Sequence, residues 1–275
     1  MKCFYPALIG LCLLISVQGC RKNKQFDLHP ILNAVNDNLL SQRPFQYAFT
    51  MLVKASLDSV LIKDLHSMID GAYVTLDPDA KTLIFFFVGN TGQDSVVRYG
   101  SFTASLDTEF LITGACALFS FKAYLEDYHR VQGNFSIRNN GVNQDGLTEF
   151  TSLIDSALVT KDSIRNIHWS GNMVYQLTPF NSRDNPRKIL ITTLGAGSGV
   201  SSMGYPFQFL IMDPLKDSIL CPWYHDGRIR VVLSEGDITS GSIEFMGKSE
   251  CNNRIDYDFE GRLYHRWFSE KYLKE

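Results

Sequence analysis

The chain has 275 residues, of which 45% are hydrophobic and 20% charged, enough for one large globular domain or two modest ones and unlike a disordered or low-complexity chain. Lys and Arg number 26 against 29 Asp and Glu. This balance argues against nucleic-acid binding, which requires a concentrated basic face. The composition is biased toward strand-forming residues, with 19 Phe and 12 Tyr.

The N-terminus has the pattern of an export signal. Lys2 is followed by an apolar run from Ala7 to Val17, which is shorter than the roughly 20 residues that a membrane-spanning helix needs. The following Val17-Gln18-Gly19-Cys20 resembles the lipobox of bacterial lipoproteins, in which a small residue precedes the lipidated cysteine. We therefore predict a signal peptide at residues 1–19 and a lipid anchor on Cys20. The alternative is an ordinary cleaved signal that ends near a cysteine.

Residues 20–34 are predicted to form the lipidated cysteine and a tether. The tether begins with the basic stretch 21–24, whereas Bacteroidota lipoproteins displayed on the cell surface resemble one another in having acidic residues there. This difference favours an outer-membrane protein that faces the periplasm. Residues 35–71 are expected to form a short mixed segment, which Pro44 and Gly71 break into one or two short helices. A strand from Tyr47 to Val53 is the alternative.

From residue 72 to residue 275 the pattern is that of β-structure. Phe135 and Ile137 alternate with polar residues, and the same period of two recurs from Ile255 to Phe259. Hairpin tips are expected at residues 139–141, 144–146, 226–227 and 235–237, which are rich in Asn, Asp and Gly. We predict an all-β fold, a predominantly antiparallel β-meander arranged as an extended or sandwich-like sheet.

The glycine-rich stretch Gly195-Ala196-Gly197-Ser198-Gly199 does not fit a nucleophile elbow, because Ser198 is flanked directly by glycine on both sides. It does not open a helix in a βαβ unit, so phosphate binding is not expected. We interpret the stretch as a long hairpin loop.

Several segments resemble a family of uncharacterised Bacteroidota lipoproteins. They are Tyr124–Gly141, Ile167–Gly171, and a C-terminal pattern that includes Cys221-Pro222-Trp223, Ser242–Phe245 and Glu250-Cys251-Asn252-Asn253. The resemblance covers about residues 75–265, although Asn252 stands where the family usually has Asp. Its motifs are structural in type, so the resemblance implies a fold and a compartment and no particular activity.

The resemblance implies that Cys221 and Cys251, which recur in the family, form a disulfide in the oxidising envelope. Two buried thiols are the alternative. Cys116 lies in an apolar run and is expected to be a core thiol.

Other candidate sites are weak. The six histidines show no metal-ligand spacing, so neither a metal nor a cofactor is expected. Asp256, Asp258 and Glu260 are expected on one solvated strand face, with a cation site or a glycosidase acid pair as the alternative. Core packing is expected for five aromatic residues, with a sugar-stacking platform as the alternative. These are Trp169, Trp223, Tyr224, Tyr264 and Trp267.

The pair Asp-Ser followed by an apolar residue occurs five times, which resembles the O-glycosylation signal of Bacteroidota envelope proteins. The candidate acceptors are Ser59, Ser95, Ser156, Ser163 and Ser218. Simple turn chemistry is the alternative, since Asp and Ser are both favoured in turns.

Together these features lead us to expect a membrane-anchored envelope lipoprotein that binds a ligand or partner without catalysis. A glycan or another envelope protein is the expected partner besides the membrane itself. The alternatives are a glycan-directed hydrolase that uses dispersed carboxylates, and a structural component of an outer-membrane assembly.

Overall fold

The computed structural model describes residues 27–162, 165–179, 189–246 and 254–267. Within these residues, two helices precede fourteen strands. They are α2 (His29–Leu57), α3 (Ser59–Asp64), β1 (His66–Ile69), β2 (Ala72–Asp77), β3 (Thr82–Thr91), β4 (Val97–Leu106), β5 (Cys116–Glu126), β6 (His129–Val142), β7 (Thr148–Thr160), β8 (Asn166–Leu177), β9 (Leu190–Val200), β10 (Pro206–Ser218), β11 (Cys221–Leu233), β12 (Ser240–Phe245), β13 (Arg254–Phe259) and β14 (Arg262–Trp267).

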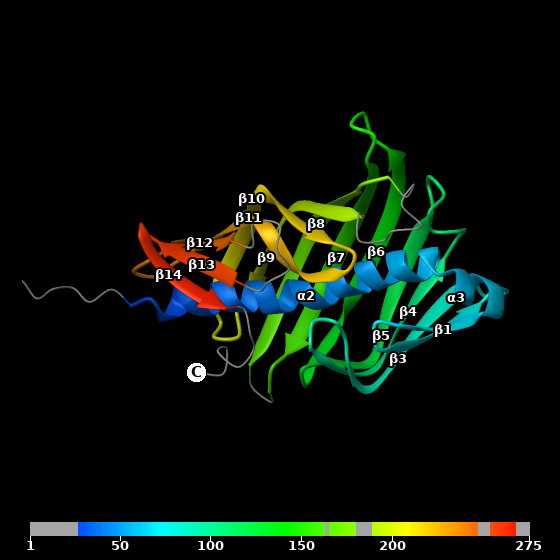
Figure 1. Cartoon of the computed structure of the whole chain (residues 1–275). Coiled ribbons are helices and arrows are strands. Elements are labelled where there is room, and N and C mark those ends of the chain that lie inside the picture. Colours follow the sequence, from blue (N-terminus) through cyan, green and yellow to red (C-terminus); the bar gives the residue numbers. More distant parts are fainter. Residues whose placement is uncertain (1–26, 163–164, 180–188, 247–253, 268–275) are drawn as a thin grey trace, which may run out of the picture.

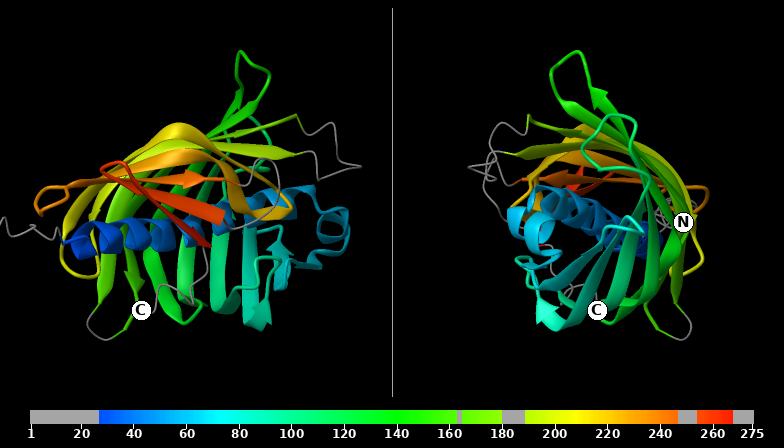
Figure 2. Two further views of the ribbon diagram at one scale, coloured as in Figure 1. Left: turned by 60° about the vertical axis from the view of Figure 1, so that its left-hand side comes forward. Right: turned by 90° about the vertical axis from the view of Figure 1, so that its right-hand side faces the viewer.

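All fourteen strands form one sheet in which the spatial order is the chain order, and each strand is antiparallel to the next (Figure 1). The predicted antiparallel β-meander is confirmed. The sheet is strongly curved, and α2 lies along its concave side (Figure 2). The apolar inner faces of the strands therefore pack on a helix instead of on a second sheet.

The N-terminal region differs from its prediction. A single helix of 29 residues runs from His29 through Pro44 to Leu57, so neither the break at Pro44 nor the alternative strand at Tyr47–Val53 is correct. The helix also occupies part of the expected tether. The free-energy cost of an internal proline is outweighed here because 19 of the 29 residues are buried by the sheet around the helix.

Polar residues on α2 contact the surrounding loops and strands, which explains why the helix lacks a simple amphipathic pattern. Asp37 accepts hydrogen bonds from Lys161 Nζ at 3.1 Å and from the amide of Ser202 at 2.6 Å. Tyr257 donates its hydroxyl to Asn36 at 2.7 Å. These contacts hold the N-terminal half of the helix against the later strands.

Aromatic rings from the strands surround the middle of α2. Phe45 makes edge-on contacts with Phe121, Phe135 and Trp169, with ring centroids 5.4–5.5 Å apart. Phe49 stacks on Tyr175 at 4.1 Å. The helix is therefore the centre of the hydrophobic core, to which most strands contribute.

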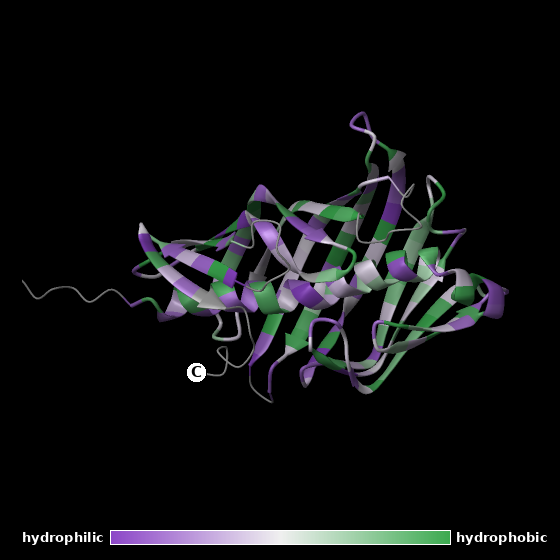
Figure 3. Cartoon of the chain, in the orientation of Figure 1, coloured by the Kyte–Doolittle hydropathy of each residue, from purple (hydrophilic) through white to green (hydrophobic). Residues whose placement is uncertain are grey.

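The alternation expected for β6 and β13 is present, with Phe135 and Ile137 buried in β6 and Ile255, Tyr257 and Phe259 buried in β13. Hydrophilic and hydrophobic residues alternate along many strands (Figure 3). The outward face of the first strands is an exception. It carries exposed apolar side chains at Met68, Tyr73, Ile84, Phe86 and Val88.

Two of the four expected hairpin tips are correct. Residues 144–146 and 235–237 lie in the β6–β7 and β11–β12 connections. Residues 139–141 instead lie within β6, where Asn139 is buried and donates to the carbonyl of Phe110 at 3.0 Å. Residues 226–227 lie within β11 at a shift of register opposite β10. Asn, Asp and Gly mark β-bulges at both places, because bulges need the same unusual backbone angles as turns.

The glycine-rich stretch 195–199 is part of β9 and not a hairpin loop. A side chain at Gly197 would place its Cβ 2.6 Å from the ring of Phe209 on β10 and 2.4 Å from the carbonyl oxygen of Ser170 on β8. A side chain at Gly199 would lie 2.8 Å from the ring of Phe207. The glycines therefore make room for aromatic rings of the neighbouring strand, which cover the bare backbone.

Candidate functional site

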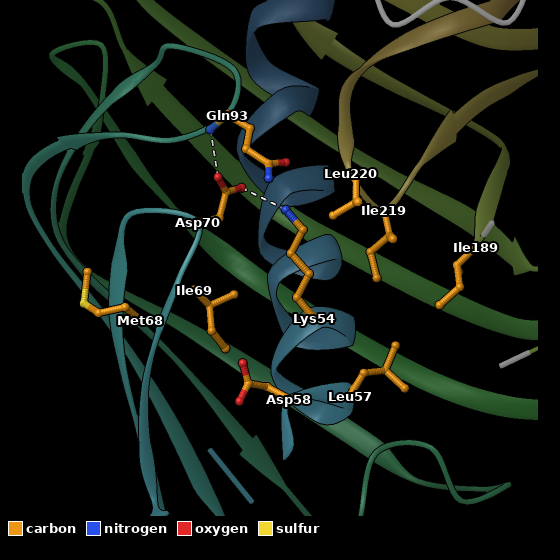
Figure 4. Close-up of a pocket in the computed structure, with 10 residues that line it drawn as sticks. All are labelled: Lys54, Leu57, Asp58, Met68, Ile69, Asp70, Gln93, Ile189, Ile219 and Leu220. Atoms are coloured by element: carbon orange, nitrogen blue, oxygen red, sulfur yellow. Dashed lines mark hydrogen bonds and ion pairs between the residues drawn. The ribbon is translucent and has the colours of Figure 1, made fainter. Parts of the chain in front are cut away.

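A pocket of about 300 Å³ lies at the C-terminal end of α2 (Figure 4). The end of α2, the β1–β2 hairpin, the β3–β4 loop and the β10–β11 turn surround it. Its lining consists of Lys54, Leu57, Asp58, Met68, Ile69, Asp70, Gln93, Ile189, Ile219 and Leu220. Six of these ten side chains are apolar, so the pocket combines an apolar wall with a few polar groups, as small-molecule sites do.

Asp70 owes its position to a tight hairpin. Ile69 pairs with Ala72, so Asp70 and Gly71 form a two-residue turn. Their φ angles are 47° and 80°. Asp-Gly suits this type of turn, since both central residues need positive φ. The turn presents the Asp70 carboxylate to α2, where Lys54 Nζ lies 2.9 Å from Oδ2. The amide of Gln93 donates to Oδ1 at 2.7 Å, as Figure 4 shows.

Asp58 forms the other polar part of the pocket and also has a structural role. Its Oδ1 accepts a hydrogen bond from the amide of Leu61 at 2.7 Å and caps the N-terminus of α3. Its Oδ2 accepts from the hydroxyl of Ser67 at 3.3 Å. Both carboxylates of the pocket are therefore already bonded to the protein.

A second, smaller cavity of about 30 Å³ lies next to the pocket, and we call it the inner chamber. It shares Lys54, Asp70 and Ile219 with the pocket, so the Lys54–Asp70 ion pair lies at the boundary of the two spaces. The complete lining is Arg43, Gln46, Tyr47, Thr50, Lys54, Asp70, Asp94, Asp217, Ile219 and Cys221. A cavity of this volume has room for about two water-sized groups.

Asp217 of β10 is the ionisable group in the chamber with the fewest partners among the described residues. It is 4% exposed, and its Oδ2 accepts a hydrogen bond from Gln46 Nε2 at 3.1 Å. Its Oδ1 and the Oε1 of Gln46 have no hydrogen-bond partner among the described residues. Burial raises the pKa of Asp217 well above its usual value, despite the opposing effects of the bond from Gln46 and of the Lys54 charge.

A buried ionic network borders the chamber, and its members Arg43 and Asp94 belong to the chamber lining. Arg98 on β4 is fully buried and pairs with Asp94 at 2.5 Å and with Glu126 on β5 at 3.2 Å. Arg43 on α2 binds the other oxygen of Glu126 at 2.6 Å, which links the helix to the sheet. The Arg98 guanidinium also lies 3.5 Å from the ring centre of Tyr47.

The network controls the charge state of Glu126. Burial alone would raise the pKa of Glu126, but the charges of Arg98 and Arg43 outweigh it, so the pKa lies below the usual value. Sequence reasoning missed this network. The sequence did contain a signal for it. Every second side chain of a β-strand faces the same side, and Arg98 lies an even number of positions before Phe102 and Ala104, which face the core.

Among the cysteines of the predicted pair, Cys221 is disulfide-bonded and lies beside the inner chamber. Cys251 and the predicted anchor Cys20 are outside the described residues. The pairing of Cys221 with Cys251 stays a prediction. Cys116 is a free thiol at a half-buried position on β5.

The structure separates the other candidate residues. Asp256 is buried and its Oδ1 lies 2.7 Å from His265 Nδ1, so the expected solvated face of β13 is wrong for this residue.

Trp169 is 3% exposed and packs in the core, which confirms core packing there. The half-buried Trp223, Tyr224 and Tyr264 also pack against the core. The Trp267 side chain lies outside the described part of the structure.

The candidate glycosylation serines are scattered and do not form a site together. Ser59, Ser95 and Ser156 are exposed and Ser218 is half-buried, while Ser163 is outside the described residues. Ser95 lies in the β3–β4 connection with a φ of 61°, as turn chemistry favours, whereas Ser156, with a φ of 53°, lies within β7 at a shift of register opposite β8.

No protein-family model matches the sequence, and comparisons with curated proteins and with solved structures find no match. No helix in the described ranges is long and apolar enough to cross a membrane. The described residues also contain no group of three or more His, Cys, Asp or Glu side chains placed to hold a metal ion.

Proposed function

We propose that this chain is a non-enzymatic binding protein that takes a small amphipathic ligand into the pocket at the C-terminal end of α2. The observation that carries the proposal is the pocket itself, with about 300 Å³ of space between apolar walls and a Lys54–Asp70 pair at its inner boundary. Apolar walls favour the hydrocarbon part of a ligand, and the few polar groups would orient its head.

We further propose that the protein is held in the cell envelope by a lipid on Cys20, at an outer membrane and facing the periplasm. The support is the sequence Val17-Gln18-Gly19-Cys20 after a short apolar run, followed by the basic residues 21–24. A binding protein in this place would meet small molecules that enter the periplasm. A glycan or an envelope protein is the alternative class of partner.

A glycan-directed hydrolase is less well supported. Such an enzyme needs two carboxyl groups in a cleft, one of which acts as a general acid. Asp58 and Asp70 line the pocket, but the first caps α3 and the second is bound to Lys54. Asp217 has the raised pKa of a general acid, yet the chamber of about 30 Å³ around it is too small for a sugar ring. The other alternative, a structural component of an outer-membrane assembly, would favour a flat surface, and the pocket at the end of α2 does not fit that expectation.

Binding of simple amphiphiles tests the proposal. The full chain, in nanodiscs of zwitterionic lipid, is titrated calorimetrically with hexanol, hexanoate and hexylamine, and empty nanodiscs give the background. Gln93 is exposed at the rim of the pocket, so Gln93→Trp should fill the space without disturbing the core. The matched control is Gln208→Trp on the exposed face of β10.

We expect at least one probe to bind the wild type, and Gln93→Trp to weaken it at least tenfold. Gln208→Trp should bind as the wild type does. Failure of all three probes to bind, or equal binding by the two variants, would contradict the proposal.

A further inference from the structure

When Asp217 is ionised, the side chains around the inner chamber carry more negative than positive charge. Three cationic side chains, Arg43, Lys54 and Arg98, line it or pair with residues that line it. Five carboxylates face them, namely Asp70, Asp94, Glu126, Asp127 and Asp217. Within this group Asp94, Glu126 and Asp127 are paired with an arginine and Asp70 with Lys54, which leaves Asp217 without a salt bridge among the described residues.

Two polar atoms of the chamber lack partners among the described residues, and both are acceptors when Asp217 is ionised. The Gln46 amide points its Nε2 at Asp217 Oδ2, which leaves its Oε1 unbonded, and Asp217 Oδ1 is likewise unbonded among the described residues. A buried acceptor without a partner costs about 1–3 kcal/mol, more if it is charged, so a donor in the chamber would be stabilised. A positively charged donor would also offset the excess of carboxylates.

We infer that the chamber is the head-group site of the proposed pocket and that it takes the ammonium group of an amphipathic primary amine, with Asp217 as the counter-ion and Gln46 as a second acceptor. The inference rests on the proposed function, because the hydrocarbon part of the amine occupies the pocket. The Lys54–Asp70 pair lines both cavities, so Asp70 can accept a hydrogen bond from the ammonium as it enters.

The size and the acceptors of the chamber select among cations. A volume of about 30 Å³ admits an –NH₃⁺ group but not a quaternary ammonium with three methyl groups. Calcium requires six to eight oxygen ligands, whereas Asp70 and Asp94 are already paired with cations and only Asp217 and Gln46 offer unbonded oxygens among the described lining residues. A primary ammonium has three N–H donors, which suit Asp217 Oδ1, Gln46 Oε1 and a water molecule.

Binding changes the protonation of Asp217. The carboxyl group is uncharged in the empty chamber over the pH range below its raised pKa, and the incoming ammonium favours the ionised form. Each amine bound therefore releases one proton from Asp217 to the solvent, while the amine keeps its own. The other ionisable groups that act on Asp217 are Lys54 on α2, Tyr175 on β8 and Tyr224 on β11.

The experiment compares hexylamine, hexanol, hexanoate and hexyltrimethylammonium with the full chain in nanodiscs of zwitterionic lipid. We expect hexylamine to bind at least tenfold more tightly than the other three. Its affinity should rise by up to tenfold per pH unit below the pKa of Asp217. Titrations in buffers of different ionisation enthalpy should show close to one proton released per amine.

Two variants separate the head-group site from the pocket. Asp217→Asn keeps the shape and removes the charge, and it should lower hexylamine affinity to that of hexanol and abolish the proton release. Gln46→Leu should weaken hexylamine about tenfold and leave hexanol unchanged, which tests the site even if Asp217→Asn does not fold. Near-wild-type hexylamine binding in both variants would overturn the inference.

The outcomes also distinguish the two proposals. If hexanol or hexanoate binds in the pocket at least as well as hexylamine, the amine site is wrong and the proposed binding function stands. If none of the probes binds, both proposals fail.

Discussion

Asp217 is a carboxyl group that is almost fully buried and has a single hydrogen-bond donor from a side chain, Gln46. Glu126, which is equally buried, has two arginine partners. The two groups therefore respond to pH in opposite directions. Glu126 has a lowered pKa, so it contributes stability at pH values above its unfolded pKa and loses it as the pH falls through the folded pKa.

For Asp217 the sign is reversed. Its folded pKa is raised, so the folded state holds a proton that the unfolded state releases, and the free energy of unfolding falls as the pH rises between the two pKa values. The slope can reach about 1.4 kcal/mol per pH unit. We predict that Asp217→Asn removes this decline, as measured by urea unfolding from pH 4 upward. Asp155→Asn, at an exposed carboxylate of β7, is the matched control and should retain the decline.

Cys20 carries the second prediction at this scale. If its thiol takes the lipid, cells grown with labelled palmitate should label the wild-type chain and leave Cys20→Ala unlabelled and out of the membrane fraction. Cys116→Ala is the control, because Cys116 is a free thiol within the described part of the chain. Equal labelling of wild type and Cys20→Ala would refute the anchor.

At the scale of single elements, β9 depends on the absence of side chains at its glycines. Gly197→Ala would push a methyl group against the Phe209 ring and the Ser170 carbonyl oxygen. Overpacking of this kind costs about 1–3 kcal/mol. For a domain of this size we expect a fall in melting temperature of about 2–12 °C, measured by circular dichroism. Ser198→Ala, on the exposed side of the same strand, should change it little.

The strands were predictable because their evidence is local. The period of two in β6 and β13 depends only on which residues face the core, so the antiparallel meander could be predicted without knowledge of distant contacts. The same reasoning failed for α2. Its polar residues, such as Asp37 and Gln46, find partners on β-strands and loops more than 100 positions away, and a pattern within the helix does not report them.

The candidate site could not be predicted for the same physical reason, because its residues lie far apart in the sequence. Lys54 and Asp70 lie 16 positions apart, while Gln46 and Asp217 lie 171 apart. The curved sheet brings these residues to one end of the helix. The glycine stretch of β9 shows a related limit, since its composition fits a loop equally well until the rings of β10 are placed beside it.

At the scale of the whole molecule, the core is organised around the helix. Phe45 is fully buried and contacts rings from β5, β6 and β8. Replacement of a buried Phe by Ala costs about 3–5 kcal/mol. We predict that Phe45→Ala lowers the melting temperature by about 6–20 °C and weakens near-ultraviolet circular dichroism. Phe86→Ala, on the exposed face of β3, should have a much smaller effect.

The helix also determines at which end of the domain the pocket lies. A helix of 29 residues spans about 43 Å, and the pocket lies at its C-terminal end. The predicted anchor Cys20 lies nine positions before His29, at the N-terminal end. The pocket therefore lies at the opposite end of α2 from His29.

The strict agreement between strand order and chain order has a consequence for how the molecule assembles. A chain that crosses a membrane or leaves the ribosome from its N-terminus delivers α2 first and then the strands in the order in which they pair. Each new strand finds its partner already in place as the last exposed edge, so no strand has to wait for one that is still to come. The sheet can grow around the helix one hairpin at a time, and only short loops need to close at each step.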